Sequence, residues 1–246
     1  MCGVGLMDKI TNTLIHSPGR TASNKITDLF WLQGSWQIEN TPQRIREHIL
    51  KKKRSAFNLY HYHYRDFDIS EPVAVHSHTY WLPRYIEGWT YISSLRRNIA
   101  LQSASMLWAR RHDCWHGEQP YAEPIKLTGD EFAEEFKRNL KLSIDSVNFA
   151  KLNWHTAKIV YYEDIAQLTA EQLWKYLGFR TQDFNNRSTE WPKSATGLDY
   201  TKLITNYHQL AKQQNRAWQT QIRQLENAVT DFQNIGRKTR LPRKKP

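Results

Sequence analysis

One short run of residues near the N-terminus combines the residue types that bind an anion: SPGRTASNK, residues 17–25. The small residues, Ser17, Gly19 and Ala22 among them, let the backbone curl so that its N–H groups and the N-terminus of a following helix point at one anion. Side chains add further donors, which come from Arg20, Thr21, Ser23 and Asn24. The arginine contributes a planar cation that suits phosphate or sulfate oxygens. The run lacks the GxxxxGK[ST] spacing of a Walker A loop, which disfavours an ATP-dependent kinase, and a run of this kind is often only a turn.

A second group of candidate residues lies where a predicted strand meets a predicted helix, in YISSLRRNIALQSASMLWARR, residues 91–111. Arg96 and Arg97 end the strand, and Ser105 follows about two helical turns into the helix. An arginine at the end of a strand and a hydroxyl on the next helix can both reach one phosphate. The alternative is that Ser103 and Ser105 are small packing residues and that both arginines are solvated.

The elements that must position these two groups alternate between strands and helices. Runs of aromatic and β-branched residues predict strands at residues 11–17, 57–64, 72–78, 89–95 and 157–162. Helical spacing predicts helices over residues 26–32, 42–53, 98–111, 129–147, 170–177 and 203–232.

Two of these helices carry capping boxes, Thr128 with Glu131 and Thr169 with Gln172, and Gly178 ends the second of them. The alternation predicts an α/β fold in which a mostly parallel sheet has helices on both faces. Ligands bind such sheets beyond the carboxyl ends of the strands, which is where both groups of candidate residues lie.

Composition supports a globular protein with an anionic partner. A chain of 246 residues suits one large α/β domain or two small ones, and a hydrophobic fraction of 39% with ten Trp argues against disorder. The net charge of +11 favours nucleic acid, a membrane surface or phosphorylated and sulfated ligands. Much of the excess is local, in KKKR (51–54) and GRKTRLPRKK (236–245), and at least half of it is expected to be solvated surface.

The sequence predicts a soluble protein of a reducing, cytoplasmic compartment. Only Cys2 and Cys114 are present, so no disulfide framework is expected. No signal-peptide pattern is evident, and no apolar run approaches the ~20 residues of a membrane span.

Together, the two groups of candidate residues resemble those of the PAPS-dependent sulfotransferases, where PAPS is 3′-phosphoadenosine 5′-phosphosulfate. In that family the first loop binds the 5′-phosphosulfate, and an Arg-to-Ser pair binds the 3′-phosphate. LRRNIALQSASMLWARRHDCWHG (95–117) is most similar to the bacterial trehalose-sulfotransferase-like branch, and KIVYYEDIAQLTAEQLWKYLGF (158–179) resembles a late strand, turn and helix of the family. The resemblance spans roughly residues 11–180.

The resemblance implies roles for individual residues. Ser17, Gly19, Arg20, Thr21, Ala22, Ser23 and Asn24 would bind the donor, together with Arg96 or Arg97 and Ser105. Arg20 would also stabilise charge on the transferred group and on the leaving phosphate. Two residues compete for the role of base: His78, in the position of the family's catalytic His, and Glu39, which follows Arg20 at the distance seen in the trehalose-type branch. His76 stands where cytosolic members have a lysine, a departure that leaves the lysine's role uncovered or transfers it to Arg20.

Three other interpretations compete with this one. Histidines at a spacing of two (His61 with His63, His76 with His78, and His112 with Cys114 and His116) suit a zinc site on strands, but no CxxC or HExxH spacing accompanies them. The start MCGVG resembles class II glutamine amidotransferases, but the chain contains no Asn-Gly dipeptide. A non-enzymatic nucleic-acid-binding protein would use the basic and aromatic surface, although no RRM, KH or zinc-finger signature is present.

We therefore expect a three-layer α/β sandwich with a central parallel sheet, a P-loop-like sulfotransferase fold and a long C-terminal helix. Residues 1–235 would form this domain, and residues 236–246 a basic tail. The expected reaction moves a sulfuryl group from PAPS to the hydroxyl of a carbohydrate or small metabolite and releases adenosine 3′,5′-bisphosphate, with no metal required. Nucleic acid is not an expected partner, and the formation of a homodimer is left open.

Overall fold

A four-stranded parallel sheet lies at the centre of the computed structural model, which describes residues 13–21, 25–26, 29, 74–77, 90–113, 123–179 and 198–238. Its strands are β1 (Thr13–His16), β2 (Ala74–Ser77), β3 (Thr90–Leu95) and β4 (Ala157–Tyr161), in the order β2-β1-β3-β4. Every neighbouring pair is parallel, with Thr13 opposite Ala74 and Thr90, and Tyr91 opposite Ala157. Four of the predicted strands and the parallel sheet are thereby confirmed.

Helices make up most of the described chain. They are α4 (Ile99–Arg111), α5 (Gly129–Leu152), α6 (Tyr162–Ile165), α7 (Ala170–Tyr176), α8 (Tyr200–Leu203), α9 (Tyr207–Ala217) and α10 (Gln219–Lys238). Lys25, Ile26 and Leu29 are also helical. The mixed α/β class predicted from the alternating pattern is confirmed.

Both predicted capping sites begin helices. The Thr128 hydroxyl accepts a hydrogen bond from the Glu131 backbone N–H at the start of α5. At α7 the capping box is complete, because Thr169 and Gln172 each bond the backbone of the other. Gly178, just after this helix, has a φ of 86°, as the predicted C′ glycine requires.

The two faces of the sheet pack against different helices, because side chains alternate along each strand. Ile15, Ile92 and Val160 lie on one face, in a cluster with Trp174 of α7 and Phe179. On the opposite face Tyr91 packs against Phe149 of α5, with ring centroids 4.5 Å apart. His16 lies on that same face, with its ring nitrogen 2.5 Å from the Ser146 hydroxyl of α5.

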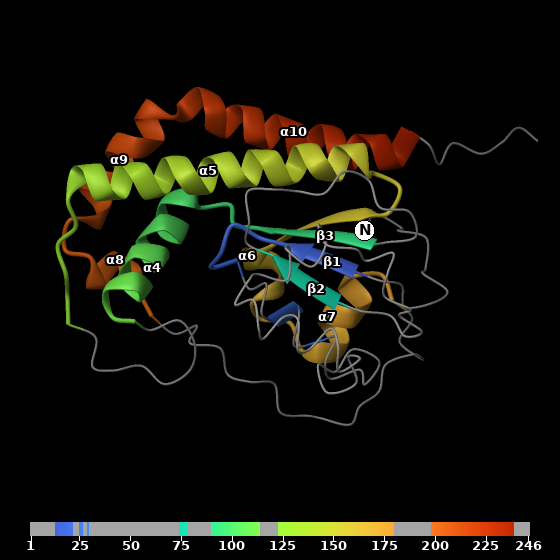
Figure 1. Ribbon diagram of the computed structural model, residues 1–246, viewed down its shortest axis with the longest axis horizontal. Coiled ribbons are helices and arrows are strands. Elements are labelled where there is room, and N and C mark those ends of the chain that lie inside the picture. The colour runs from blue at the N-terminus through green and yellow to red at the C-terminus, as the bar shows by residue number, and fades with distance from the viewer. Residues whose placement is uncertain are drawn as a thin grey trace, which may run out of the picture.

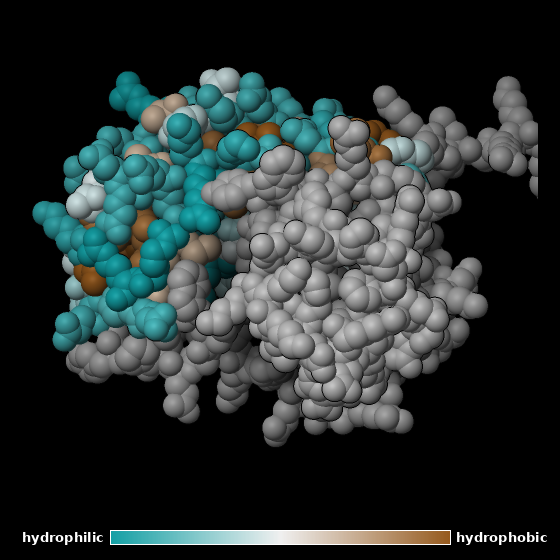
Figure 2. Space-filling model, viewed as in Figure 1, coloured by the Kyte–Doolittle hydropathy of each residue, from teal (hydrophilic) through white to brown (hydrophobic). Residues whose placement is uncertain are grey.

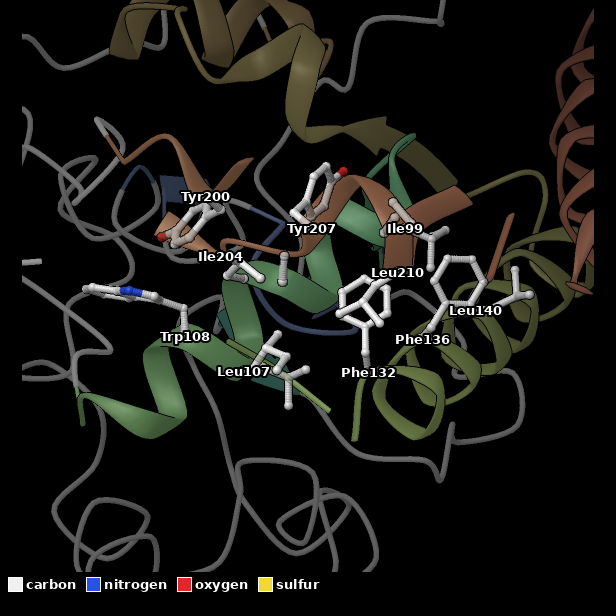
Figure 3. Packing of buried hydrophobic residues seen from close by; sticks show 14 of the residues in the cluster. Ile99, Leu107, Trp108, Phe132, Phe136, Leu140, Tyr200, Ile204, Tyr207 and Leu210 are labelled. Carbon is white, nitrogen blue, oxygen red and sulfur yellow. The ribbon is translucent and has the colours of Figure 1, made fainter. Parts of the chain in front are cut away.

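A larger hydrophobic cluster fills the space between the helices. It joins residues of α4, α5, α8 and α9 (Figure 3), among them Trp108, Phe132, Phe136, Ile204 and Leu210. The long helices α5 and α10 lie side by side (Figure 1) and close this cluster, with Leu225 and Val229 of α10 buried in it. Figure 2 shows that the described surface over these helices is mainly hydrophilic.

The long C-terminal helix differs from the prediction. Periodicity predicts one helix over residues 203–232, whereas the structure has α9 and α10, separated at Trp218, whose φ and ψ are −110° and 18°. The bend lets α9 pack against α4 and α8 while α10 follows α5. No proline or glycine lies at the bend, so the sequence carries no breaker that would reveal it.

Some predictions concern residues outside the described ones. The strand at 57–64 and the helix at 42–53 are among them, as are Cys2, His61, His63, Cys114 and His116. The helix α10 continues through Lys238, across the predicted domain boundary at residue 236. In the described part of the chain, no helix has the length and apolar character needed to cross a membrane. The three-layer sandwich with a P-loop-like sulfotransferase fold stays a prediction.

Candidate anion-binding site

The loop that follows β1 is bound to α4 and to β3. Gly19 has a φ of 75°, and a side chain there would overlap the Met106 side chain of α4. The side-chain amide of Gln102, also on α4, donates hydrogen bonds to the carbonyl oxygens of Pro18 and Gly19, at 3.2 and 2.9 Å. The Ser94 hydroxyl donates to the carbonyl oxygen of Thr21. The loop is thus placed at the carboxyl end of the parallel sheet, beside the first turns of α4.

Arg20 connects this loop to two hydroxyl groups that are distant in the sequence. Its Nε donates a hydrogen bond to Ser105 Oγ at 2.9 Å, and its Nη2 donates to Tyr200 Oη at 2.8 Å. Ser105 and Tyr200 are buried, while Arg20 itself is partly exposed. A hydroxyl that accepts one hydrogen bond still has its own proton to donate. The cluster therefore presents a cation and two hydroxyl groups at one place.

Arg96 adds a second cation near Arg20. It is buried, its guanidinium lies over the Tyr162 ring at 4.4 Å from the ring centroid, and its Nε has no hydrogen-bond partner. Glu163 is the nearest acid, with 3.9 Å between Arg96 Nε and Glu163 Oε1. Burial lowers the pKa of Arg96, and the positive charge of Arg20 lowers it further, against the opposing effect of Tyr162, Glu163 and Tyr200. An anion bound between the two arginines would relieve this repulsion.

Arg97 points elsewhere. It forms a two-point ion pair with Asp164, with both N–O distances at 2.7 Å, and lies over the Tyr161 ring. These hydrogen bonds are the main reason that the pKa of Arg97 is raised above its ordinary value. Arg97 lines a different, open cleft of about 680 Å³, whose other wall comes from α9 and α10, including Arg216 and Arg223.

The structure brings together some of the predicted donor-binding residues. Ser17 and Thr21 are buried in the loop, and the Thr21 hydroxyl has no hydrogen-bond partner. Lys25, at the end of the run, donates to the carbonyl oxygens of Ala166 and Leu168 at 2.8 Å each, so its amine ties the run to the segment that follows α6.

Other predicted residues lie outside the described part of the chain. These are Ala22, Ser23 and Asn24 of the loop, and Glu39 and His78, the two candidate bases.

Sequence reasoning missed Tyr200. The residue follows Asp199, whose side chain caps the short helix α8 through the Thr201 backbone N–H at 3.1 Å. No motif links position 200 to position 20, so only the packing of α8 against α4 reveals the contact. Glu163 and Asp164 were visible as the Tyr-Glu-Asp turn after β4, although the sequence did not assign them to either arginine.

Nothing in the described residues forms a metal centre. No group of three or more His, Cys, Asp and Glu residues gathers there. His112 lies at the end of α4, with Nδ1 2.9 Å from the Trp108 carbonyl oxygen and its ring stacked on the Trp108 ring. This placement gives His112 a structural role at the C-terminus of the helix.

Comparison with known proteins found no matching family model, no matching curated protein and no matching solved structure. Two guanidinium groups and the hydroxyl groups of Ser105 and Tyr200 suit a tetrahedral anion such as phosphate or sulfate.

Proposed function

We propose that this protein is a sulfotransferase, which moves a sulfuryl group from PAPS to an acceptor hydroxyl and releases adenosine 3′,5′-bisphosphate. One observation carries the proposal: Arg20, in the loop after β1, contacts Ser105, in the helix after β3. Two groups of candidate anion ligands that are 85 residues apart in the sequence thus lie side by side at the carboxyl end of the sheet. PAPS carries a phosphosulfate and a separate 3′-phosphate, so a protein that binds it needs two neighbouring groups of anion ligands, one for each.

The proposed reaction uses charge and position. The acceptor oxygen attacks the sulfur, the bond from sulfur to the bridging phosphate oxygen breaks, and the acceptor's proton passes to a base, for which Glu39 and His78 are the candidates. Charge grows on the leaving phosphate during this step, and a fixed cation nearby stabilises it. Arg20 is the residue we assign to that role, with Arg96 adding to the positive field.

The acceptor in this proposal is a carbohydrate or a small metabolite. The proposal includes the three-layer, P-loop-like sulfotransferase fold, a cytoplasmic location and a reaction that needs no metal. The proposal is supported by the resemblance of the two motifs to those of the PAPS-dependent sulfotransferases, and by the contact between Arg20 and Ser105.

Binding of adenosine 3′,5′-bisphosphate tests the proposal most directly. A ligand at one hundred times its Kd stabilises the folded protein by about 2.7 kcal/mol, which for a chain of this size raises Tm by roughly 5–10 °C. We expect such a shift in the wild type and in Arg111→Ala, and a much smaller one in Arg20→Ala. Arg111 is a matched control, because it lies on α4 and its guanidinium also bonds protein groups, Glu131 and Lys126.

Each variant is compared with its own melting temperature without ligand, since Arg20→Ala also removes two internal hydrogen bonds. No shift in the wild type would overturn the proposed function. An undiminished shift in Arg20→Ala would place the nucleotide elsewhere. Sulfate transfer from PAPS to a panel of sugars and alcohols then identifies the acceptor.

A further inference from the structure

Tyr200 occupies a place in the anion site that the motifs do not explain. Its hydroxyl accepts a hydrogen bond from Arg20 Nη2 at 2.8 Å, although the two residues are 180 positions apart. We propose that Tyr200 is a positioning residue, which holds the Arg20 guanidinium in the orientation that binds a tetrahedral anion. This inference rests on the proposed function for the identity of the nucleotide, but the anion site itself can be tested apart from it.

The hydrogen bonds of Arg20 fix its guanidinium at two points. Nε is bound to Ser105 and Nη2 to Tyr200, so rotation about the end of the side chain is restricted. The backbone contributes as well, because Arg20 has a φ of 53°, in the left-handed region that few residues other than glycine adopt. An arginine side chain loses rotamer entropy when it is fixed, and ordering it before the ligand arrives removes that cost from binding.

Tyr200 is itself held firmly enough to position another residue. It is 7% exposed, and its ring packs edge-on against Trp108 with centroids 5.9 Å apart. The end of α8 is joined to the segment before α5, because the Ile125 N–H donates to the Leu203 carbonyl oxygen at 2.7 Å. The Ile125 carbonyl oxygen in turn accepts from the Thr205 N–H at 2.9 Å. The tyrosine hydroxyl is thus a fixed point rather than a surface group.

The position of Arg96 explains why the orientation matters. Arg96 is buried near enough to Arg20 that the positive charge of Arg20 lowers the pKa of Arg96. Two like charges repel, and a guanidinium without its hydroxyl partner would turn away from the second cation. The hydrogen bond from Arg20 Nη2 to the Tyr200 hydroxyl opposes that movement.

The test uses Tyr200→Phe, which keeps the ring and its packing against Trp108 but removes the hydroxyl. Tyr176→Phe is the matched control, because its half-exposed hydroxyl makes only a 3.4 Å contact with Asp164. Both variants are made in the wild type and in Arg20→Lys, which keeps the charge but has no planar fork. Stabilisation is measured with two probes, adenosine 3′,5′-bisphosphate and inorganic sulfate, each at a series of concentrations.

We expect Tyr200→Phe to raise the apparent Kd of either probe about tenfold in the wild-type background, and to have little effect in the Arg20→Lys background. Tyr176→Phe should change neither value. An equal loss from Tyr200→Phe in both backgrounds would overturn the inference, because Tyr200 would then act independently of Arg20. An unchanged Kd in Tyr200→Phe would also overturn it.

The two probes separate this inference from the proposed function. If sulfate stabilises the protein through Tyr200 and the nucleotide does not bind, the proposed function fails and the inference stands. If the nucleotide binds and Tyr200→Phe leaves its Kd unchanged, the proposed function stands and the inference fails. If neither probe stabilises the wild type, both are wrong.

Discussion

Lys158 is a buried cation whose removal should stabilise the protein. It lies on β4 with 8% exposure, and its amine has no hydrogen-bond partner. The positive charge of the amine has a weak cation–π contact with the Phe179 ring, whose centroid is 5.7 Å away. Burial lowers the pKa of Lys158 from 10.5 to about 8. Since one pH unit corresponds to about 1.4 kcal/mol, the charged amine costs the folded state about 3 kcal/mol near pH 7.

The sign of the pH dependence follows from the lowered pKa. Below pH 8 both the folded and the unfolded chain hold this proton, so the full cost is present. Between pH 8 and pH 10.5 the unfolded chain holds the proton and the folded protein has released it. The contribution of Lys158 to the free energy of unfolding therefore becomes more favourable as the pH rises through this window, and the cost disappears above it.

Lys158→Met tests this reasoning, because methionine is unbranched and adapts to an apolar site. We expect the variant to gain about 3 kcal/mol in the free energy of unfolding at pH 7, measured by urea denaturation, and about 1 kcal/mol near pH 9.5. Lys141→Met is the control. Its lysine is exposed and pairs with Asp145 across one helical turn, so its loss should cost a few tenths of a kcal/mol. A Lys158→Met protein that is less stable at pH 7, or a gain that does not change with pH, would refute the argument.

Three further predictions concern stability. Gly19→Ala should cost at least about 1 kcal/mol, because alanine is strained at a φ of 75°; adding Met106→Ala removes the overlap but not the strain, so full recovery of stability in the double variant would contradict this explanation. Thr169→Ala should cost about 1 kcal/mol in urea denaturation through loss of the capping box, whereas Thr230→Ala, on an exposed face of α10, should be neutral. Arg97→Ala should lower the free energy of unfolding by less than about 1 kcal/mol, because its ion pair is half-exposed; a loss above 2 kcal/mol would show that this pair is structural.

The sequence was sufficient for elements whose signals are local. The start of α5 follows from Thr128 and Glu131, and its buried face from Phe132, Phe136 and Leu140 at helical spacing. The four described strands are short, but their aromatic and β-branched runs predict their positions correctly. In both cases the deciding interactions lie within a few residues of each other, so a single sequence contains them.

The features of the fold and the site that the sequence did not reveal depend on contacts between distant segments. Tyr200 reaches Arg20 only because α8 is docked on α4, and no periodic pattern encodes that docking. The bend at Trp218 arises from the different partners of α9 and α10, and the residues at the bend are ordinary helix residues. Arg96 and Arg97 were equivalent in the sequence argument, yet consecutive residues at the end of a strand point to opposite sides. The sheet register and the helices on each side were needed to tell which arginine joins Arg20.

The order of the strands has a consequence for how the chain folds during synthesis. The first strand, β1, occupies an interior position, between β2 and β3, and both partners are made much later. Until β3 (Thr90–Leu95) has left the ribosome, β1 has no neighbour on the side where β3 will pair with it. The strand β4 completes the sheet only after the whole of α5 has been made. Parallel pairing of this kind closes long stretches of chain and is intrinsically slow. The nascent chain therefore holds an unpaired apolar strand for an extended time, which makes the early stages of synthesis the point at which a chaperone would act.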